Sequence, residues 1–176
     1  EYIKKLSKIC KQNDILITFD EMQAGFSRTG KNFGFQHYGI KPDLICCGKG
    51  MGGGVPLSGV IGRKDLLDLP EIGNMSSTNS ANPISCSAGL AVIEEIQNKN
   101  LTYQSKIKGT ILHNELKKIS KLKRNLFKVY GKGLIAALIF NKNIKNIDKR
   151  LKSLVEACIR DGLLMVYTGR ESIKLG

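Results

Sequence analysis

Residues 15–21 read Ile15-Leu16-Ile17-Thr18-Phe19-Asp20-Glu21, a continuous apolar run that ends in two acidic side chains. Its β-branched and aromatic residues favour a strand. A strand without polar alternation is typical of a parallel sheet that is covered on both faces. The run therefore predicts a buried parallel strand with Asp20 at its carboxyl end. Ligands of open parallel sheets bind beyond that end, which makes Asp20 a candidate site residue.

A second apolar run, from Leu44 to Cys47, leads through Gly48 to Lys49 and a glycine-rich loop. It predicts a neighbouring strand whose end presents Lys49. A loop lysine is usually solvated, but a partly desolvated lysine amine is a nucleophile that forms Schiff bases. Asp20 and Lys49 at one sheet edge could form a plain ion pair. They could instead hold pyridoxal phosphate, which needs an amine for its aldehyde and a carboxylate for its ring nitrogen.

Apolar periodicity and turn residues predict the remaining elements. The organisation changes near residue 100, where an α/β region with buried parallel strands gives way to a smaller, basic α/β region. The expected helices cover residues 2–12, 84–98, 102–120 and 147–161, and the expected further strands cover residues 59–62, 134–140 and 163–166.

The net charge of +13 lies entirely in the second region. Residues 1–98 hold 10 basic and 10 acidic side chains, whereas residues 99–176 hold 18 basic and 5 acidic ones. Such asymmetry can indicate a nucleic-acid surface. The lysines of residues 99–128, however, alternate with Leu and Ile at helical spacing, and few aromatic residues lie among them. We therefore expect a solvated helix face rather than a nucleic-acid partner.

The chain is expected to work in the cytoplasm, away from membranes. No apolar run approaches the ~20 residues of a membrane span, and residues 1–5 do not resemble a signal peptide. Five irregularly spaced cysteines favour reduced, buried thiols over disulfides, and no Cys/His set predicts a metal site.

Residues 19–30, Phe-Asp-Glu-Met-Gln-Ala-Gly-Phe-Ser-Arg-Thr-Gly, closely resemble the D-E-x-Q-x-G-x-x-R-T-G stretch of the class III aminotransferases, which are fold type I pyridoxal phosphate enzymes. The likeness continues through residues 37–39, 41–43 and 48–58. It ends with residues 76–83, which look like the family's S-T-x-x-x-N-P segment. The matches occur in order over residues 1–98, while residues 99–176 resemble the family's small C-terminal domain mainly at residues 131–137 and 162–164.

The resemblance implies a role for each matched residue. Lys49 would bind the cofactor as an aldimine and then move the proton during catalysis. Asp20, also catalytic, would pair with the pyridinium nitrogen. Gln23 would hydrogen-bond the ring's phenolic oxygen, and Thr78 would bind the cofactor phosphate from the partner subunit. Arg28 would support its loop or form a structural ion pair.

The same resemblance implies the fold. Residues 1–98 would be the C-terminal portion of the large domain of a fold type I transferase, a mostly parallel sheet flanked by helices. Residues 99–176 would be an incomplete small C-terminal α/β domain. Family chains are more than twice as long, so we expect this chain to be a fragment that lacks the N-terminal half and the extreme C-terminus. The full-length protein would be a homodimer, and the chain alone would be inactive.

The implied function is transfer of an amino group from an amine or amino-acid donor to a keto acid or aldehyde. Lys174 stands where many members of the family carry an arginine that binds the substrate carboxylate, and a lysine is not an equivalent clamp. Two alternatives stay open: a semialdehyde aminomutase of the same fold, and a non-catalytic remnant or interaction module. Gln23 and residues 28–30 favour the aminotransferase.

Overall fold

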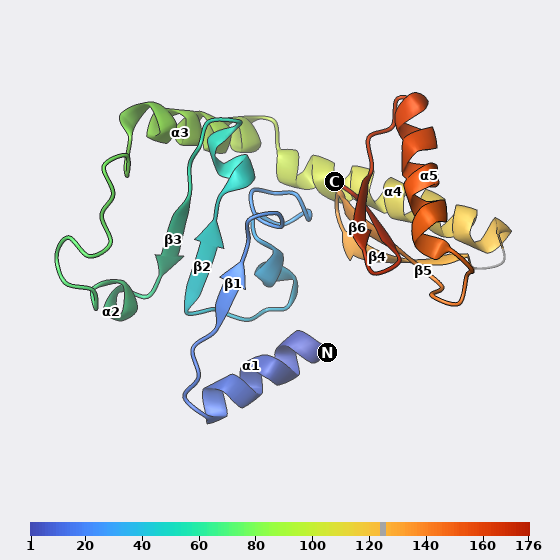
Figure 1. The fold of residues 1–176 in the computed structure, drawn as a ribbon. Coiled ribbons are helices and arrows are strands. Elements are labelled where there is room, and N and C mark those ends of the chain that lie inside the picture. Colours follow the sequence, from blue (N-terminus) through green and yellow to red (C-terminus); the bar gives the residue numbers. More distant parts are fainter. Residues whose placement is uncertain (124–125) are drawn as a thin grey trace. The chain divides into compact units, whose positions relative to one another are not determined.

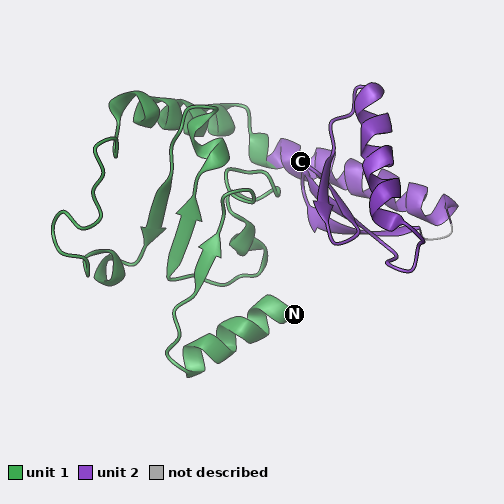
Figure 2. Cartoon of the chain, viewed as in Figure 1, with its two compact units in different colours: residues 1–102 green, residues 103–176 purple. Residues whose placement is uncertain are grey.

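The computed structural model describes residues 1–123 and 126–176, which form two compact units. Unit 1 comprises residues 1–102 and unit 2 comprises residues 103–176 (Figure 2). Both units contain helices and strands (Figure 1). None of the helices among the described residues combines the length and apolar character that a membrane crossing requires.

Unit 1 contains a three-stranded sheet with the order β1-β2-β3. β1 and β2 are parallel, as predicted, whereas β2 and β3 are antiparallel. The glycine-rich loop after β2 forms a short 3-10 helix, η2, and α3 packs against it. The elements of this unit are α1 (Tyr2–Gln12), β1 (Thr18–Asp20), η1 (Gly34–His37), β2 (Leu44–Cys47), η2 (Lys49–Gly52), β3 (Gly59–Gly62), α2 (Lys64–Leu67) and α3 (Pro83–Asn98).

The first strand is shorter and more exposed than its apolar run predicts. Ile15 and Leu16 precede the strand and are 54% and 51% exposed, and Thr18 and Asp20 are exposed within it. The prediction of a strand buried on both faces is therefore wrong for the described residues. The physical reason is that no helix among these residues packs extensively on β1.

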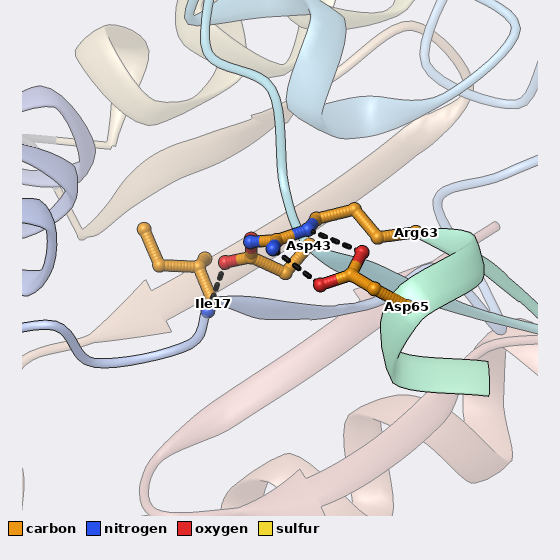
Figure 3. A network of polar contacts seen from close by, with 4 residues as sticks. All are labelled: Ile17, Asp43, Arg63 and Asp65. Atoms are coloured by element: carbon orange, nitrogen blue, oxygen red, sulfur yellow. Dashed lines mark hydrogen bonds and ion pairs between the residues drawn. The ribbon is translucent and has the colours of Figure 1, made fainter. Parts of the chain in front are cut away.

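A polar network joins the starts of the two parallel strands to the end of β3 (Figure 3). The Ile17 amide donates to Asp43 Oδ2 at 2.8 Å, and Arg63 Nη1 donates to Asp43 Oδ1 at 3.0 Å. Arg63 Nε also donates to Asp65 Oδ1 at 3.0 Å. The hydrogen bonds from Ile17 and then from Arg63 hold the pKa of Asp43 below its ordinary value of 3.8.

Unit 2 contains a four-stranded antiparallel sheet with the order β4-β5-β7-β6. Its core consists of Phe127, Leu138, Phe140, Leu151, Met165 and Ile173. Long helix α4 begins at the last two residues of unit 1 and continues into unit 2. The elements are α4 (Leu101–Leu122), β4 (Phe127–Lys132), β5 (Ile135–Phe140), α5 (Ile147–Arg160), β6 (Val166–Gly169) and β7 (Ser172–Leu175).

Two strands of unit 2 differ from the sequence prediction. β4 was not predicted, because two lysines and a glycine interrupt its three large apolar side chains. The strand expected at residues 163–166 lies at Val166–Gly169 instead. Leu164 is 79% exposed, so the apolar character of residues 163–166 does not mark the paired segment.

Candidate active site

Lys49 is the first residue of η2 and adopts a left-handed backbone conformation with φ of 48°. Its side chain is exposed to solvent. A Cβ at the preceding Gly48 would lie 2.5 Å from Met22 Sδ, so a side chain there would have to displace Met22. This close approach brings the loop that carries Lys49 against the segment that follows β1.

Asp20 ends β1 and lies level with Cys46 in the parallel register. The next amide, that of Glu21, still donates to the Cys46 carbonyl at 2.9 Å. Asp20 Oδ1 accepts the Met22 amide at 3.0 Å, which fixes the carboxylate at the start of the following turn. Asp20 and Lys49 thus leave the same edge of the sheet, as the parallel strands predict.

The described residues do not support the plain ion-pair interpretation of Asp20 and Lys49. The salt bridges among residues 1–123 and 126–176 join other side chains, and none includes Asp20, Lys49 or Arg28. Arg28 is exposed, and since none of these salt bridges includes it, a structural ion pair among the described residues does not explain it either.

A cavity of about 650 Å³ opens beside Lys49. It lies within the size range of about 300–1,000 Å³ that is typical of small-molecule sites. Its wall combines the glycine-rich loop with hydroxyl and amide side chains. It is lined by Lys49, Gly54, Val55, Pro56, Leu57, Ser58, Ser77, Asn79, Ser80, Ala81, Asn82 and Ser85.

The other predicted site residues lie apart from this cavity. Gln23 is an exposed residue of the turn after β1. Thr78 is exposed on the loop before α3, whereas its neighbours Ser77 and Asn79 line the cavity. Lys174 is a half-buried residue of β7 in unit 2, paired with Ala137. The structure therefore brings Asp20 and Lys49 to one edge and does not bring Thr78 to the cavity of its own chain.

The sequence analysis missed two kinds of residue. Ser77, Ser80 and Asn82 line the cavity, and their place within the S-T-x-x-x-N-P segment was the available signal. Glu21 is 1% exposed and accepts two backbone hydrogen bonds. Its signal was an acidic residue placed directly after an apolar strand, where an unsatisfied carboxylate would be costly.

The residues present fit a cofactor that carries an aldehyde and an anionic group. Lys49 offers an amine at the mouth of a roomy cavity, and serine and asparagine side chains offer hydrogen bonds within it. Asp20 offers a carboxylate at the same sheet edge. Pyridoxal phosphate has functional groups that match this set.

The sequence of this chain is similar to those of known enzymes. A profile of the family described as aminotransferase class-III matches residues 1–176. The acetylornithine aminotransferase of a Synechocystis species is 36% identical over 98% of this chain and 40% of that protein. The leucine/methionine racemase of Thermococcus litoralis is 34% identical over 95% of this chain and 38% of that protein.

Solved structures agree. The acetylornithine aminotransferase of Elizabethkingia anophelis matches with a TM-score of 0.88 and 30% identity, over 99% of this chain and 43% of that one. The ornithine delta-aminotransferase of Plasmodium falciparum matches with a TM-score of 0.87 and 28% identity, over 99% of this chain and 44% of that one. The chain thus spans about 40% of the length of the curated relatives named above.

Proposed function

Because the chain belongs to the class III aminotransferase family, we propose that the protein carrying it is a pyridoxal-phosphate-dependent enzyme that moves an amino group from an amine or amino acid to a keto acid or aldehyde. The observation that carries the proposal is the shared sheet edge of Asp20 and Lys49, with Lys49 on a cavity of about 650 Å³. Membership of the family supports a general transaminase function, and the residues below are proposed to perform it.

Each residue has a definable task. Pyridoxal phosphate would supply an aldehyde for the amine and an electron-withdrawing ring. Lys49 would hold it through its side-chain amine, which would also carry a proton during the reaction. The Asp20 carboxylate keeps the ring nitrogen protonated, and Gln23 donates to the phenolic oxygen. Thr78 would hydrogen-bond the phosphate bound to a second subunit, a role consistent with its position outside the cavity of its own chain.

Several finer assignments belong to the same proposal. Residues 1–98 contribute to a cofactor-binding domain, and residues 99–176 to a smaller domain. The working form is a homodimer in the cytoplasm, and the isolated 176-residue chain is inactive. The relatives named as acetylornithine aminotransferases favour an amino-acid donor.

Covalent trapping tests the role of Lys49. The protein that contains these residues is mixed with pyridoxal phosphate, and its absorbance is recorded near roughly 420 nm, where lysine-bound cofactor absorbs. Borohydride reduction followed by peptide mass spectrometry should place the label on Lys49. Lys49→Ala should lose band and label, whereas Lys41→Ala should keep both. If the label persists in Lys49→Ala, Lys49 is not the residue that binds the cofactor.

Transfer of the amino group separates the proposed reaction from its alternatives. With a ¹⁵N-labelled amino acid and an unlabelled keto acid, an aminotransferase moves the ¹⁵N to the keto acid. A racemase inverts the donor and keeps its ¹⁵N, and an aminomutase moves it within one molecule. Absence of all three reactions in a protein that binds the cofactor would favour the non-catalytic alternative.

A further inference from the structure

Glu21 is a buried carboxylate to which the proposed chemistry assigns no task. Only 1% of the residue is exposed. Its Oε2 accepts the Gly34 amide at 2.8 Å, and its Oε1 accepts the Phe35 amide at 2.8 Å. A buried charge is costly unless it is satisfied, and hydrogen bonds to an ionised acceptor are the strong kind. Glu21 therefore ties the start of η1 to the end of β1.

Two glycines lie close to Glu21, one beside its carboxylate and one beside its backbone carbonyl. A Cβ on Gly34 would lie 3.2 Å and 3.3 Å from the two Glu21 carboxylate oxygens. A Cβ on Gly25 would lie 2.8 Å from the Glu21 carbonyl oxygen and 3.4 Å from its Cβ. The Gly25 amide also donates to that carbonyl at 2.9 Å. The chain at Gly25 thus approaches the Glu21 backbone more closely than a Cβ allows, and at Gly34 a Cβ would push the Glu21 carboxylate by a few tenths of an ångström.

The turn held by Glu21 also packs on the strand that carries Asp20. Phe35 meets Phe19 of β1 edge to face, with ring centroids 5.9 Å apart, and Phe33 stacks on Phe35 at 5.9 Å. On the side of β2, burial first and then the Glu21 charge raise the pKa of the Cys47 thiol. Glu21 therefore lies where β1, β2 and η1 converge.

We propose that Glu21 is a positioning residue, whose clasp on the Gly34 and Phe35 amides fixes the orientation of its neighbours Asp20 and Gln23 toward the cofactor. This inference rests on the proposed function of those two residues. The Asp20 carboxylate accepts the Met22 amide, and the Glu21 amide donates to the Cys46 carbonyl of β2. The side-chain clasp of Glu21 adds the tie to η1, and without it the segment keeps its bond to β2 and loses that second support.

The test compares Glu21→Gln, Glu21→Asp and a surface control, Glu71→Gln, in the protein that contains this chain. Gln keeps the side-chain shape but replaces one acceptor oxygen with an amide donor, and Asp keeps the charge on a shorter arm. Amide hydrogen exchange at Gly34 and Phe35 reads the clasp without any cofactor. It should accelerate by about tenfold or more in Glu21→Gln, since a hydrogen bond to a charged group is lost.

Measurements on the bound cofactor distinguish a positioning role of Glu21 from a purely structural role. Glu21→Gln should weaken pyridoxal phosphate binding about tenfold and shift the pH midpoint of its visible band, with Glu21→Asp intermediate and Glu71→Gln like wild type. Faster exchange with unchanged affinity and midpoint would overturn the inference and leave the proposed function standing. A wild-type protein that binds no pyridoxal phosphate would overturn both. If Glu21→Gln does not fold, the same readouts on Glu21→Asp decide.

Discussion

Only Cys47 and Gly48 separate Lys49 from the residue that lies level with Asp20 across the parallel strands. The spacing follows from the β1–β2 register, so the two residues leave the same edge of the sheet. A carboxylate and an amine delivered in this way suit a cofactor with a ring nitrogen at one end and an aldehyde near the other. The same register gives a direct test of Asp20.

Asp20→Asn should reduce the rate of amino transfer by about 100-fold or more, because the variant removes the charge that would keep the ring nitrogen protonated. The asparagine oxygen can still accept the Met22 amide, so the fold should not change. Steady-state rates and the absorbance of bound cofactor measure the effect. The matched control is Asp14→Asn, at an exposed residue whose φ of 54° suits asparagine. Equal rates in both variants would refute a role for the Asp20 charge.

The Asp43 network should make stability depend on acid. Its pKa lies below 3.8 in the folded chain, so its contribution is fully present above that pH and disappears as pH falls through the lowered pKa. Asp43→Asn should lose about 1 kcal/mol of unfolding free energy at neutral pH and almost nothing in strong acid. Urea unfolding across pH measures this difference. Asp68→Asn, which breaks only an exposed pair with Lys64, should match wild type at every pH.

Asn82 should stabilise α3 as its N-cap. Its Oδ1 accepts the Ile84 amide at 3.0 Å and the Ser85 amide at 3.5 Å, and Pro83 follows at the first helical position. Asn82→Ala should therefore cost about 1 kcal/mol, and Asn82→Asp should restore most of it. Thermal and urea unfolding give the values. Asn79→Ala lies on the same cavity without capping a helix, and an equal loss there would contradict the cap.

Gly109 and Gly89 should respond differently to alanine although both lie within helices. A Cβ on Gly109 would lie 2.4 Å from the backbone of Gly133, which cannot move aside, whereas a Cβ on Gly89 meets the end of the flexible Leu57 side chain at 2.7 Å. Gly109→Ala should lose about 1–3 kcal/mol through overpacking, more than the roughly 1 kcal/mol that helix propensity returns. Gly89→Ala should be close to neutral. Unfolding midpoints that place Gly109→Ala above Gly89→Ala would show that α4 does not approach Gly133 as described.

Local patterns predicted most elements of the fold. The stripes of α1, α4 and α5 and the Pro83 start of α3 fixed those helices to within two residues, because helix periodicity and capping are local signals. The run from Leu44 to Cys47 was confirmed as β2, and residues 59–62 as β3. β4 and β6 were missed or displaced although each pairs with the next strand as a short hairpin. β4 carries two lysines and a glycine, and the apolar residues 163–165 precede the segment that pairs as β6, so hydrophobicity marked neither strand.

Some residues of the candidate site could be predicted from local sequence, and others could not. Asp20 and Lys49 could be predicted because strand ends of a parallel pair share an edge. The burial of Glu21 could not, since it depends on amides at Gly34 and Phe35, more than ten residues away. The cavity residues Ser77, Ser80 and Asn82 depend on how the loop before α3 folds back toward Lys49. The proposed roles of Gln23 and Thr78 stay predictions.

The left-handed backbone of Lys49 lowers the stability of the folded protein at the position that carries the proposed nucleophile. A non-glycine residue with φ of 48° costs about 1 kcal/mol relative to glycine, which adopts that conformation freely. Lys49→Gly should therefore raise the unfolding free energy of the protein while removing its proposed nucleophile. Such an opposition is a known signature of sites at which selection for chemistry overrides selection for the fold. A search for thermostable variants would be expected to replace this lysine unless catalysis were selected alongside.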